Sequence, residues 1–460
     1  MASLIFGGGA NEVGASHKVY VFDDGTVFAI DCGLRPTGFD SDISCLFDGK
    51  LNGSQDSKNQ LDPSSIEAFP TCQTSPDMDI VPLVDFLLLT HGHFDHVGAV
   101  IYLVKKNPRI IIYATAPTRE FCKFHWFTTI DLAERKKLEP PYSPADVELA
   151  LSRMMIIAPS VGVAVNPVKV NDNLSFIPIS AGHTLGAVSC FLVYKNEAVG
   201  FDTGDISFAD TRTVQAAPRL KWNDGLRFMV VDSTRIGETN PPRKKTEAEC
   251  IETVRNAFAE GKFIRFLTYA IGRSQEAYEL AREACPDAPI FIDGAAREIS
   301  EVFLQNNAMS SDAAKHFVGD KKERFQIING IKPNIVIAPS AMRFGGCARL
   351  YAEEGISRSN HLFISLGYLD PHSPEYSFFE SEKGSVFKFG PDAIPRFCDA
   401  ERLNLTGHCD GNNVLETKDR MKPEMTILNH GDNAKMEKFI AEHPGEGFVK
   451  SENGKELKLF

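Results

Sequence analysis

Short apolar runs separated by turn-forming residues dominate the first 110 positions of the chain. Residues 19–22 and 27–30 are apolar and flank Asp23-Asp24-Gly25, which is typical of a β-hairpin. Residues 36–79 are polar and rich in turn formers, so a long surface loop or insertion is expected there. Residues 86–89 have the length and composition of a buried strand, and a helical pattern at residues 97–106 stops at Asn107-Pro108.

The pattern changes near Asn240-Pro241-Pro242. Before this point, further strands are expected at residues 110–113, 175–179, 189–194, 199–202 and 228–232. From about residue 246 to 390, helical stretches alternate with apolar runs, which is typical of a separate α/β module with parallel strands at residues 263–268, 290–292 and 335–338. Ser274 is the expected N-cap of one helix of this module. The pattern also predicts a C-terminal hairpin at residues 448–460, turned at Asn453-Gly454.

Composition places the chain among ordinary globular proteins, with 460 residues of which 43% are hydrophobic and 24% charged. No apolar run approaches the roughly 18 residues that a membrane-spanning helix needs, and the N-terminus lacks the basic patch of a signal peptide. The ten cysteines of the chain form no Cys-x-x-Cys pair, which argues against a disulfide framework or a thiolate zinc site. A soluble protein of the reducing cytoplasm, without a membrane partner, is therefore expected.

The formal net charge of -12 argues against a polyanionic partner unless bound cations or a local basic surface offset the field. Basic runs occur at residues 135–137, 243–245 and 321–322, but acidic residues flank most of them. Such runs are usually solvated helix faces. Charge alone therefore does not identify a substrate.

The strongest chemical signal is the segment Thr90-His91-Gly92-His93-Phe94-Asp95-His96. Two imidazoles two residues apart at a strand end can point the same way, because strand side chains alternate. Asp95 and His96, at the turn into the next helix, can reach a second metal beside the first. Imidazole with carboxylate suits Zn²⁺, or Mn²⁺ if carboxylate dominates.

Two metals need further ligands, and the sequence offers them downstream. His183 stands in a glycine-flanked turn, Asp205 follows an expected strand, and His430 follows the apolar pair at residues 427–428. The Asp205 carboxylate can bridge two ions about 3.5–4 Å apart, as in two-metal hydrolases. Asp31 is expected to accept a hydrogen bond from a ligating imidazole. For six other histidines, ordinary structural roles are favoured: His17, His125, His316, His361, His372 and His443.

In their order along the chain, these motifs resemble the metallo-β-lactamase superfamily. The opening Gly7-to-Gly14 segment followed by Ile30-Asp31-Cys32-Gly33 resembles one branch of it, the β-CASP nucleases. Three elements resemble motifs A, B and C of that branch: residues 230–234 with Asp232, residues 405–410 with His408, and residues 428–431 with His430. Thr406 stands in motif B where serine is common. The chain resembles ribonuclease J and the nuclease family of the cleavage and polyadenylation specificity factor, and the choice between them stays open.

The resemblance implies an α/β fold, a metallo-β-lactamase αββα sandwich with an inserted β-CASP domain. The expected division is residues 1–240 and 393–460 for the sandwich and 241–392 for the inserted domain. The implied activity is hydrolysis of RNA phosphodiester bonds, endonucleolytic or 5′-exonucleolytic, by a water activated between two divalent ions. Single-stranded RNA is the implied substrate, and the family also includes homodimers.

The resemblance also assigns roles to individual residues. His408 is implied as the proton donor to the leaving oxygen, Asp232 as its orienting carboxylate, and Asp95 as a metal ligand that also positions the water. Metal ligation is implied for seven residues: His91, His93, Asp95, His96, His183, Asp205 and His430. Substrate contacts are implied for four: Arg273, Ser340, Arg343 and Thr406. Three alternatives stay open, namely a small-molecule hydrolase of this fold, a DNA nuclease, and a non-catalytic RNA-processing subunit.

Overall fold

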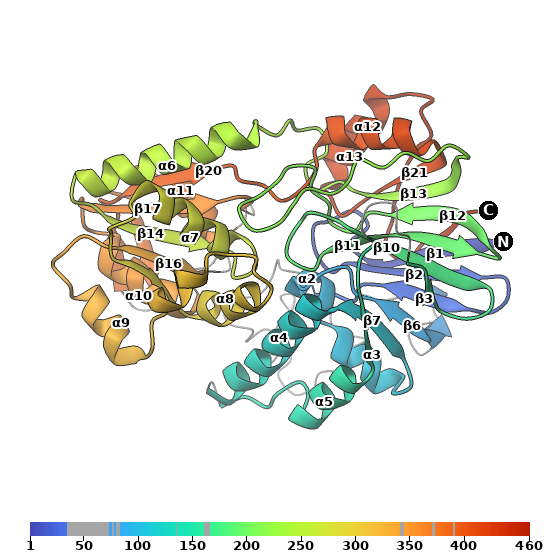
Figure 1. Cartoon of the computed structure of the whole chain (residues 1–460), viewed down its shortest axis with the longest axis horizontal. Helices are drawn as coiled ribbons and strands as arrows, with labels where there is room; N and C mark the ends of the chain where they lie inside the picture. Colours follow the sequence, from blue (N-terminus) through green and yellow to red (C-terminus); the bar gives the residue numbers. More distant parts are fainter. Residues whose placement is uncertain are drawn as a thin grey trace.

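The computed structural model describes residues 1–34, 73–75, 78–79, 83–135, 137–160, 166–340, 345–369, 373–389 and 392–460. Two seven-stranded sheets lie face to face with helices outside each sheet, and a third sheet with its own helices forms a module beside them (Figure 1). The predicted α/β fold, an αββα sandwich with an inserted α/β module, is therefore confirmed. Within the described residues, no helix has both the length and the apolar character to cross a membrane.

The first sheet has the strand order β23-β1-β2-β3-β6-β7-β8. Its strands are β1 (Ala2–Gly8), β2 (His17–Phe22), β3 (Val27–Ile30), β6 (Phe86–Leu88), β7 (Ile111–Thr115), β8 (Met154–Ile157) and β23 (Glu456–Lys458). β2 and β3 pair antiparallel, which confirms the predicted hairpin. Most of the predicted loop at residues 36–79 lies outside the described residues, apart from the small pair β4 (Gln73–Ser75) and β5 (Met78–Asp79).

The second sheet has the order β22-β21-β13-β12-β11-β10-β9. Its strands are β9 (Val168–Lys169), β10 (Leu174–Ser180), β11 (Val188–Tyr194), β12 (Glu197–Asp202), β13 (Leu226–Asp232), β21 (Pro423–Asn429) and β22 (Phe448–Lys450). β12, β13, β21 and β22 run parallel to one another. Their carboxyl ends therefore share one edge of the sandwich.

Helices cover the outer face of each sheet because both faces are apolar. On the first sheet lie α3 (Val100–Lys106), α4 (Ala116–Arg135) and α5 (Pro144–Ser152), with Trp126 fully buried among them. On the second sheet lie α12 (Gly411–Met421) and α13 (Asn433–Glu442). A central core between the sheets contains side chains such as Phe28, Phe176 and Phe228.

The module is a parallel sheet of five strands with helices on both faces. Its strand order is β15-β16-β14-β17-β20, for β14 (Phe263–Thr268), β15 (Ile290–Ile292), β16 (Ile335–Pro339), β17 (His361–Leu366) and β20 (Asp399–Leu403). One face packs against α6 (Arg243–Ala259), α7 (Arg273–Ala284) and α8 (Ala295–Gln305). The other packs against α9 (Lys321–Ile328), α10 (Gly346–Gly355) and α11 (Pro374–Glu380), near the hairpin of β18 (Val386–Phe389) and β19 (Asp392–Pro395).

Three local expectations need correction. The N-cap of α7 is Gly272, at φ 84°, and Ser274 lies inside the helix, where its hydroxyl donates to the carbonyl of Tyr269. β22 and β23 do not form a hairpin, because β22 pairs with β21 while β23 pairs with β1 in the other sheet. β20 pairs with β17, so the module's sheet extends beyond the predicted boundary at residue 392. The division into domains stays a proposal, and we place its second boundary after Leu403.

A buried ion pair links the two sheets of the sandwich. Lys18 of β2, 2% exposed, donates to Asp202 at the end of β12 over 2.6 Å, and Tyr20 donates to the same carboxylate over 2.7 Å. The Gly204 amide also donates to Asp202, over 3.0 Å. The pair therefore fixes the turn that leads to Asp205, three residues beyond Asp202.

Replacing Lys18 with methionine is expected to leave the Asp202 carboxylate buried without its cation. Breaking a buried pair in this way costs about 3–5 kcal/mol of the free energy of unfolding. Urea denaturation of the metal-free protein measures this loss. The matched control is Lys169→Met, whose pair with Asp172 is largely exposed and which should change the free energy by less than about 0.5 kcal/mol. Equal effects of both substitutions would contradict a structural role for Lys18.

Candidate metal centre

The ends of strands and short turns carry the predicted metal ligands to one edge of the sandwich. His91 and His93 follow β6, while α2 (Phe94–Val97) carries Asp95 and His96. Three more ligands come from the second sheet: His183 follows β10, Asp205 follows β12 and His430 follows β21. Parallel strands place their carboxyl ends at the same edge, which is why residues so distant in sequence meet here.

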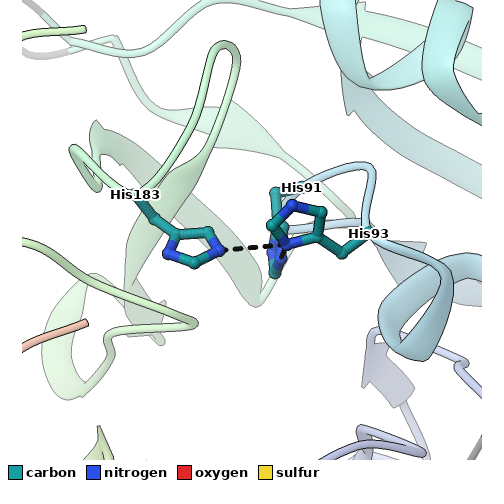
Figure 2. Close-up of side chains that lie close together, drawn as sticks. All are labelled: His91, His93 and His183. Atoms are coloured by element: carbon teal, nitrogen blue, oxygen red, sulfur yellow. Dashed lines mark hydrogen bonds between the residues drawn. The ribbon is translucent and has the colours of Figure 1, made fainter. Parts of the chain in front are cut away.

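His91, His93 and His183 form a first group of donors (Figure 2). The Nδ1 atom of His93 lies 3.0 Å from Nε2 of His91 and 3.0 Å from Nε2 of His183. The outer nitrogens of two rings are held by the protein, since Nδ1 of His183 lies 2.7 Å from the Gly407 carbonyl and Nδ1 of His91 lies 3.1 Å from Oγ1 of Thr90. Three imidazole nitrogens therefore face one point.

Asp95, His96 and His430 form a second group. Nε2 of His96 lies 3.9 Å from Oδ2 of Asp95, which in turn lies 3.5 Å from Nε2 of His430. Asp205 lies between the two groups, with Oδ2 at 3.7 Å from both His91 and His183 and at 3.4 Å from His96. Its position allows the carboxylate to contact ligands of both groups.

Asp31 contacts the second group through the Nδ1 side of the His96 ring. Its carboxylate lies 2.8 Å from Nδ1 of His96, as the sequence led us to expect, and accepts hydrogen bonds from both the amide and the hydroxyl of Thr90. Asp31 has the positive φ of 60°, an unfavourable conformation for a residue with a side chain. These contacts fix the ring plane of His96 and leave Nε2 directed into the site.

His430 also has a positive φ, 58°, and is held on several sides. Its amide donates to the Gly9 carbonyl over 2.8 Å, and the Gly14 amide donates to its Nε2 over 3.0 Å. Thr234 donates to its carbonyl over 3.0 Å. The N-terminal glycine-rich segment therefore helps to build the site.

Burial and the surrounding carboxylates divide the histidines by charge. Burial lowers the pKa of His91 and His183 well below the usual value and that of His93 to about 4, so these rings are neutral at pH 7. Burial also opposes a charge on His96, but Asp205, Asp31 and Asp95 raise its pKa well above the usual value. The cluster therefore combines neutral imidazoles, the form that binds metals, with carboxylates that attract a cation.

These donors fit a divalent cation. Nε2 of His96 is buried and has no hydrogen-bond partner, although carboxylate oxygens lie 3.4 and 3.9 Å away. A buried polar atom without a partner is costly, and a cation shared with Asp205 would satisfy it. Nitrogen and oxygen ligands in tetrahedral or slightly larger sets suit first-row divalent ions.

His408 and Asp232 form a pair beside the predicted metal ligands. Nδ1 of His408 lies 2.9 Å from Oδ2 of Asp232, which also accepts from the Ile206 amide over 3.2 Å. The amide and hydroxyl of Thr234 donate to the other oxygen of Asp232 over 2.9 and 2.7 Å. Burial opposes a charge on His408, but Asp232 and Asp205 raise its pKa above the usual value.

The four residues expected to contact substrate are differently placed. Arg273 is 7% exposed, pairs with Glu276 and donates to the Leu405 carbonyl over 2.8 Å, so protein groups engage its guanidinium. Oγ1 of Thr406 accepts from the His408 amide over 3.1 Å. Ser340 is 2% exposed and lines a pocket at the carboxyl ends of β14 and β17. Arg343 lies outside the described residues.

The sequence does not identify several groups that support the site. Thr90 and Thr234 lie inside motifs that were identified, but nothing in the sequence marks their hydroxyls as partners of Asp31 and Asp232. Lys18 stands in an apolar run, where a lone lysine in a buried strand is an available but weak signal of an ion pair. Nothing in the sequence marks the Gly407 carbonyl as the partner of His183, because this contact depends on the path of the backbone.

The sequence is also similar to those of known proteins. Residues 60–199 match the family model described as "Metallo-beta-lactamase superfamily domain". The chain is 24% identical over 359 residues to "Probable RNase MJ4" of Methanocaldococcus jannaschii, which covers 76% of this chain and 82% of the relative. It is 25% identical over 384 residues to the "RNase J-like protein" of the same organism, which covers 78% of this chain and 86% of the relative.

A third relative carries a different functional name. The chain is 24% identical over 471 residues to "Transcription termination factor FttA" of Methanothermobacter thermautotrophicus, which covers 94% of this chain and 68% of the relative. A solved structure from Enterococcus faecalis, of a protein of unknown function, aligns over 99% of both chains with a TM-score of 0.56 and 13% identity. That likeness concerns the fold alone.

The sandwich and its histidine motifs define a metallo-β-lactamase superfamily domain, a class that binds divalent metal ions. With its inserted module and these relatives, the chain resembles the β-CASP branch of that superfamily.

Asp31→Asn is expected to weaken metal binding about 10- to 100-fold, because the negative partner of His96 is lost while the side-chain shape is kept. Competition with a chromogenic chelator measures the Kd for Zn²⁺ or Mn²⁺. The control Asp172→Asn changes an exposed carboxylate far from the site and should leave the Kd unaltered. An unchanged Kd in Asp31→Asn would show that Asp31 does not prepare His96 for ligation.

Proposed function

We propose that the protein is a metal-dependent ribonuclease that hydrolyses phosphodiester bonds of single-stranded RNA. One observation carries the proposal: the His408–Asp232 pair lies beside a cluster in which all seven expected metal ligands converge. The names of two relatives, a probable RNase and an RNase J-like protein, support the same activity. The cut is internal, at the 5′ end, or both.

Two divalent ions, Zn²⁺ or alternatively Mn²⁺, are proposed for this site. His91, His93 and His183 would hold one ion, and Asp95, His96 and His430 the other, with Asp205 shared between them. When bound, such ions supply Lewis-acid stabilisation of the charge on the phosphate and acidify a water molecule. Their positive charge also offsets the acidic balance of the chain where the RNA binds.

His408 is proposed as the proton donor to the leaving oxygen. Its Nδ1–H points at the Asp232 carboxylate, so the proton to be transferred resides on Nε2. Asp232 receives three hydrogen bonds besides that of His408, which fix its position and that of the ring. The pair favours the protonated ring before transfer, and the burial of Asp232 strengthens the interaction.

Asp95 is proposed to orient the attacking water as well as to bind metal. Its side chain is 22% exposed, whereas those of His96 and Asp205 are 2% and 4% exposed. It is therefore the ligand of the second group that faces incoming solvent most openly. A carboxylate there can accept a hydrogen bond from water and direct a lone pair toward the phosphorus atom.

The RNA strand is proposed to pass between the sandwich and the module. Nε2 of His93 lies 3.4 Å from the carbonyl of Ile271, which belongs to the module, so the module borders the metal ligands directly. Ser340 lines a pocket at the carboxyl ends of the module's strands, on the side where open α/β sheets bind ligands. Ser340 and the neighbouring Arg343 are proposed to contact the RNA.

Purified protein loaded with Zn²⁺ or Mn²⁺ is expected to cleave a 5′-labelled single-stranded RNA and to leave a matched DNA uncut. His408→Ala should reduce kcat by about 10²- to 10⁴-fold, the usual contribution of a general acid. His316→Ala is the matched control, because His316 lies in the module with its ring near the carbonyl of Ile290. Fragment sizes distinguish internal cuts from trimming at the end.

Each other outcome selects a different activity. Cleavage of DNA in preference to RNA would indicate a DNA nuclease. Hydrolysis of small esters alone would indicate a small-molecule hydrolase of this fold. RNA binding without cleavage, by protein with both metals bound, would indicate a non-catalytic subunit.

The wild-type protein is expected to bind two metal ions per chain, counted by native mass spectrometry. His183→Ala should lose the ion of the first group and retain the other, because His183 belongs to only one of the proposed ligand sets. Asp205→Ala should lose both, since it is shared. Loss of a single ion in both variants would contradict the bridging role of Asp205.

A further inference from the structure

The backbone that carries His408 belongs to neither a helix nor a sheet. β20 ends at Leu403 and α12 begins at Gly411, so the intervening turn lacks the regular hydrogen bonds of both. Side chains of other elements instead contact four consecutive carbonyl oxygens. The carbonyl of Leu405 accepts from Arg273 over 2.8 Å, and that of Thr406 accepts from Arg243 over 3.2 Å. The carbonyl of Gly407 lies 2.7 Å from Nδ1 of His183, and that of His408 accepts from Asn240 over 2.9 Å. Side chains therefore determine where His408 lies.

Glu276 joins the two arginines of this set. The carboxylate, on α7, is fully buried and forms ion pairs with both Arg243 and Arg273. It also accepts a hydrogen bond from the Arg212 amide over 3.3 Å. Because a guanidinium is planar and donates in several fixed directions, one anchored edge fixes where its other donors point. Glu276 thus sets the direction of the donors that hold Leu405 and Thr406.

The same charges connect the sandwich to the module. Arg212 lies in the sandwich, after β12, and its guanidinium pairs with Glu247 at 2.7 Å and Glu283 at 2.6 Å on two helices of the module. Glu247 also pairs with Arg243 at 2.9 Å. The charges of three arginines and three glutamates therefore balance within one network of ion pairs. Loss of one buried member leaves its partners without compensation, which makes the network a unit.

We propose that Glu276 is a positioning residue for the proton donor. Through Arg243 and Arg273 it holds the backbone of residues 405–408, and so places the imidazole of His408 against Asp232 and beside the metal ligands. This inference rests on the proposed function, in which His408 protonates the leaving oxygen. It also assigns Arg273 to the placement of His408 in place of a direct contact with RNA. The same ion pairs then attach the module to the sandwich and position the proton donor.

Glu276→Gln tests this proposal by comparing two substrates. RNA releases a basic ribose oxygen that needs a proton, whereas bis(4-nitrophenyl) phosphate releases nitrophenolate, which does not. In Glu276→Gln, kcat for RNA should fall by about a hundredfold with little change in KM, the loss expected when a general acid is misplaced. Hydrolysis of the nitrophenyl ester and the bound metal content should stay near wild type in Glu276→Gln.

The matched control is Glu354→Gln. Glu354 is a largely buried glutamate of the same module that pairs with Arg358 at 2.6 Å and lies 3.1 Å from His361, away from residues 405–408. It should leave both activities unchanged. Hydrogen–deuterium exchange supplies a readout independent of catalysis: amides of residues 405–409 should exchange faster in Glu276→Gln but not in Glu354→Gln.

A second variant covers the case in which Glu276→Gln does not fold. Arg243→Lys keeps the positive charge but lacks the fork that reaches Glu247, Glu276 and Thr406 together. It should show the same selective loss against RNA and the same local exchange.

Two results would overturn the proposal: equal loss on both substrates with metals retained, or unaltered exchange at residues 405–409. A wild-type protein that hydrolyses the nitrophenyl ester but not RNA would count against the proposed ribonuclease, and the exchange measurement would still decide the role of Glu276.

Discussion

The structure of the proposed metal centre depends on the contacts between the buried carboxylate of Asp205 and the imidazoles around it. Five histidines from four chain segments lie within 4 Å of its oxygens: His91, His96, His183, His408 and His430. Burial alone would raise the pKa of this carboxyl, but His430 and His96 hold it well below the usual value. A charge in such surroundings must be compensated, so the strand ends that supply the compensation are constrained to meet at one edge of the sandwich.

Buried ion pairs, more than apolar contacts, fix the turns around that centre. Lys18 and Asp202 hold the turn before Asp205 across the two sheets, and the Glu276 network holds the turn before His408 across the sandwich and the module. Turns lack the repeated backbone hydrogen bonds of strands, so polar side chains must supply the order. Although the protein is acidic overall, these basic side chains are buried, where they order the turns around the site.

Local motifs were sufficient to predict the strands before the histidine motifs, the parallel module strands and the convergence of the seven residues that are proposed as metal ligands. Features that depend on distant partners were not predictable. The last two strands join different sheets because each finds an open edge elsewhere, and a local turn signal at Asn453-Gly454 cannot show this. Arg273 is predicted to contact substrate, whereas its ion pair with the buried Glu276 is recognisable only in three dimensions. Most of residues 36–79, and Arg343, lie outside the described residues, so those expectations stay predictions.

The left-handed backbone of Asp31 and His430 limits how the centre can change. Glycine would relax either position by about 1 kcal/mol, yet it would remove a carboxylate or an imidazole that nothing nearby replaces. Substitutions selected for thermal stability alone would therefore favour loss of function at these two positions. Directed evolution of this scaffold would have to gain its stability elsewhere, and a stabilised variant with either residue changed would be recognisable as a folded protein that has lost its chemistry.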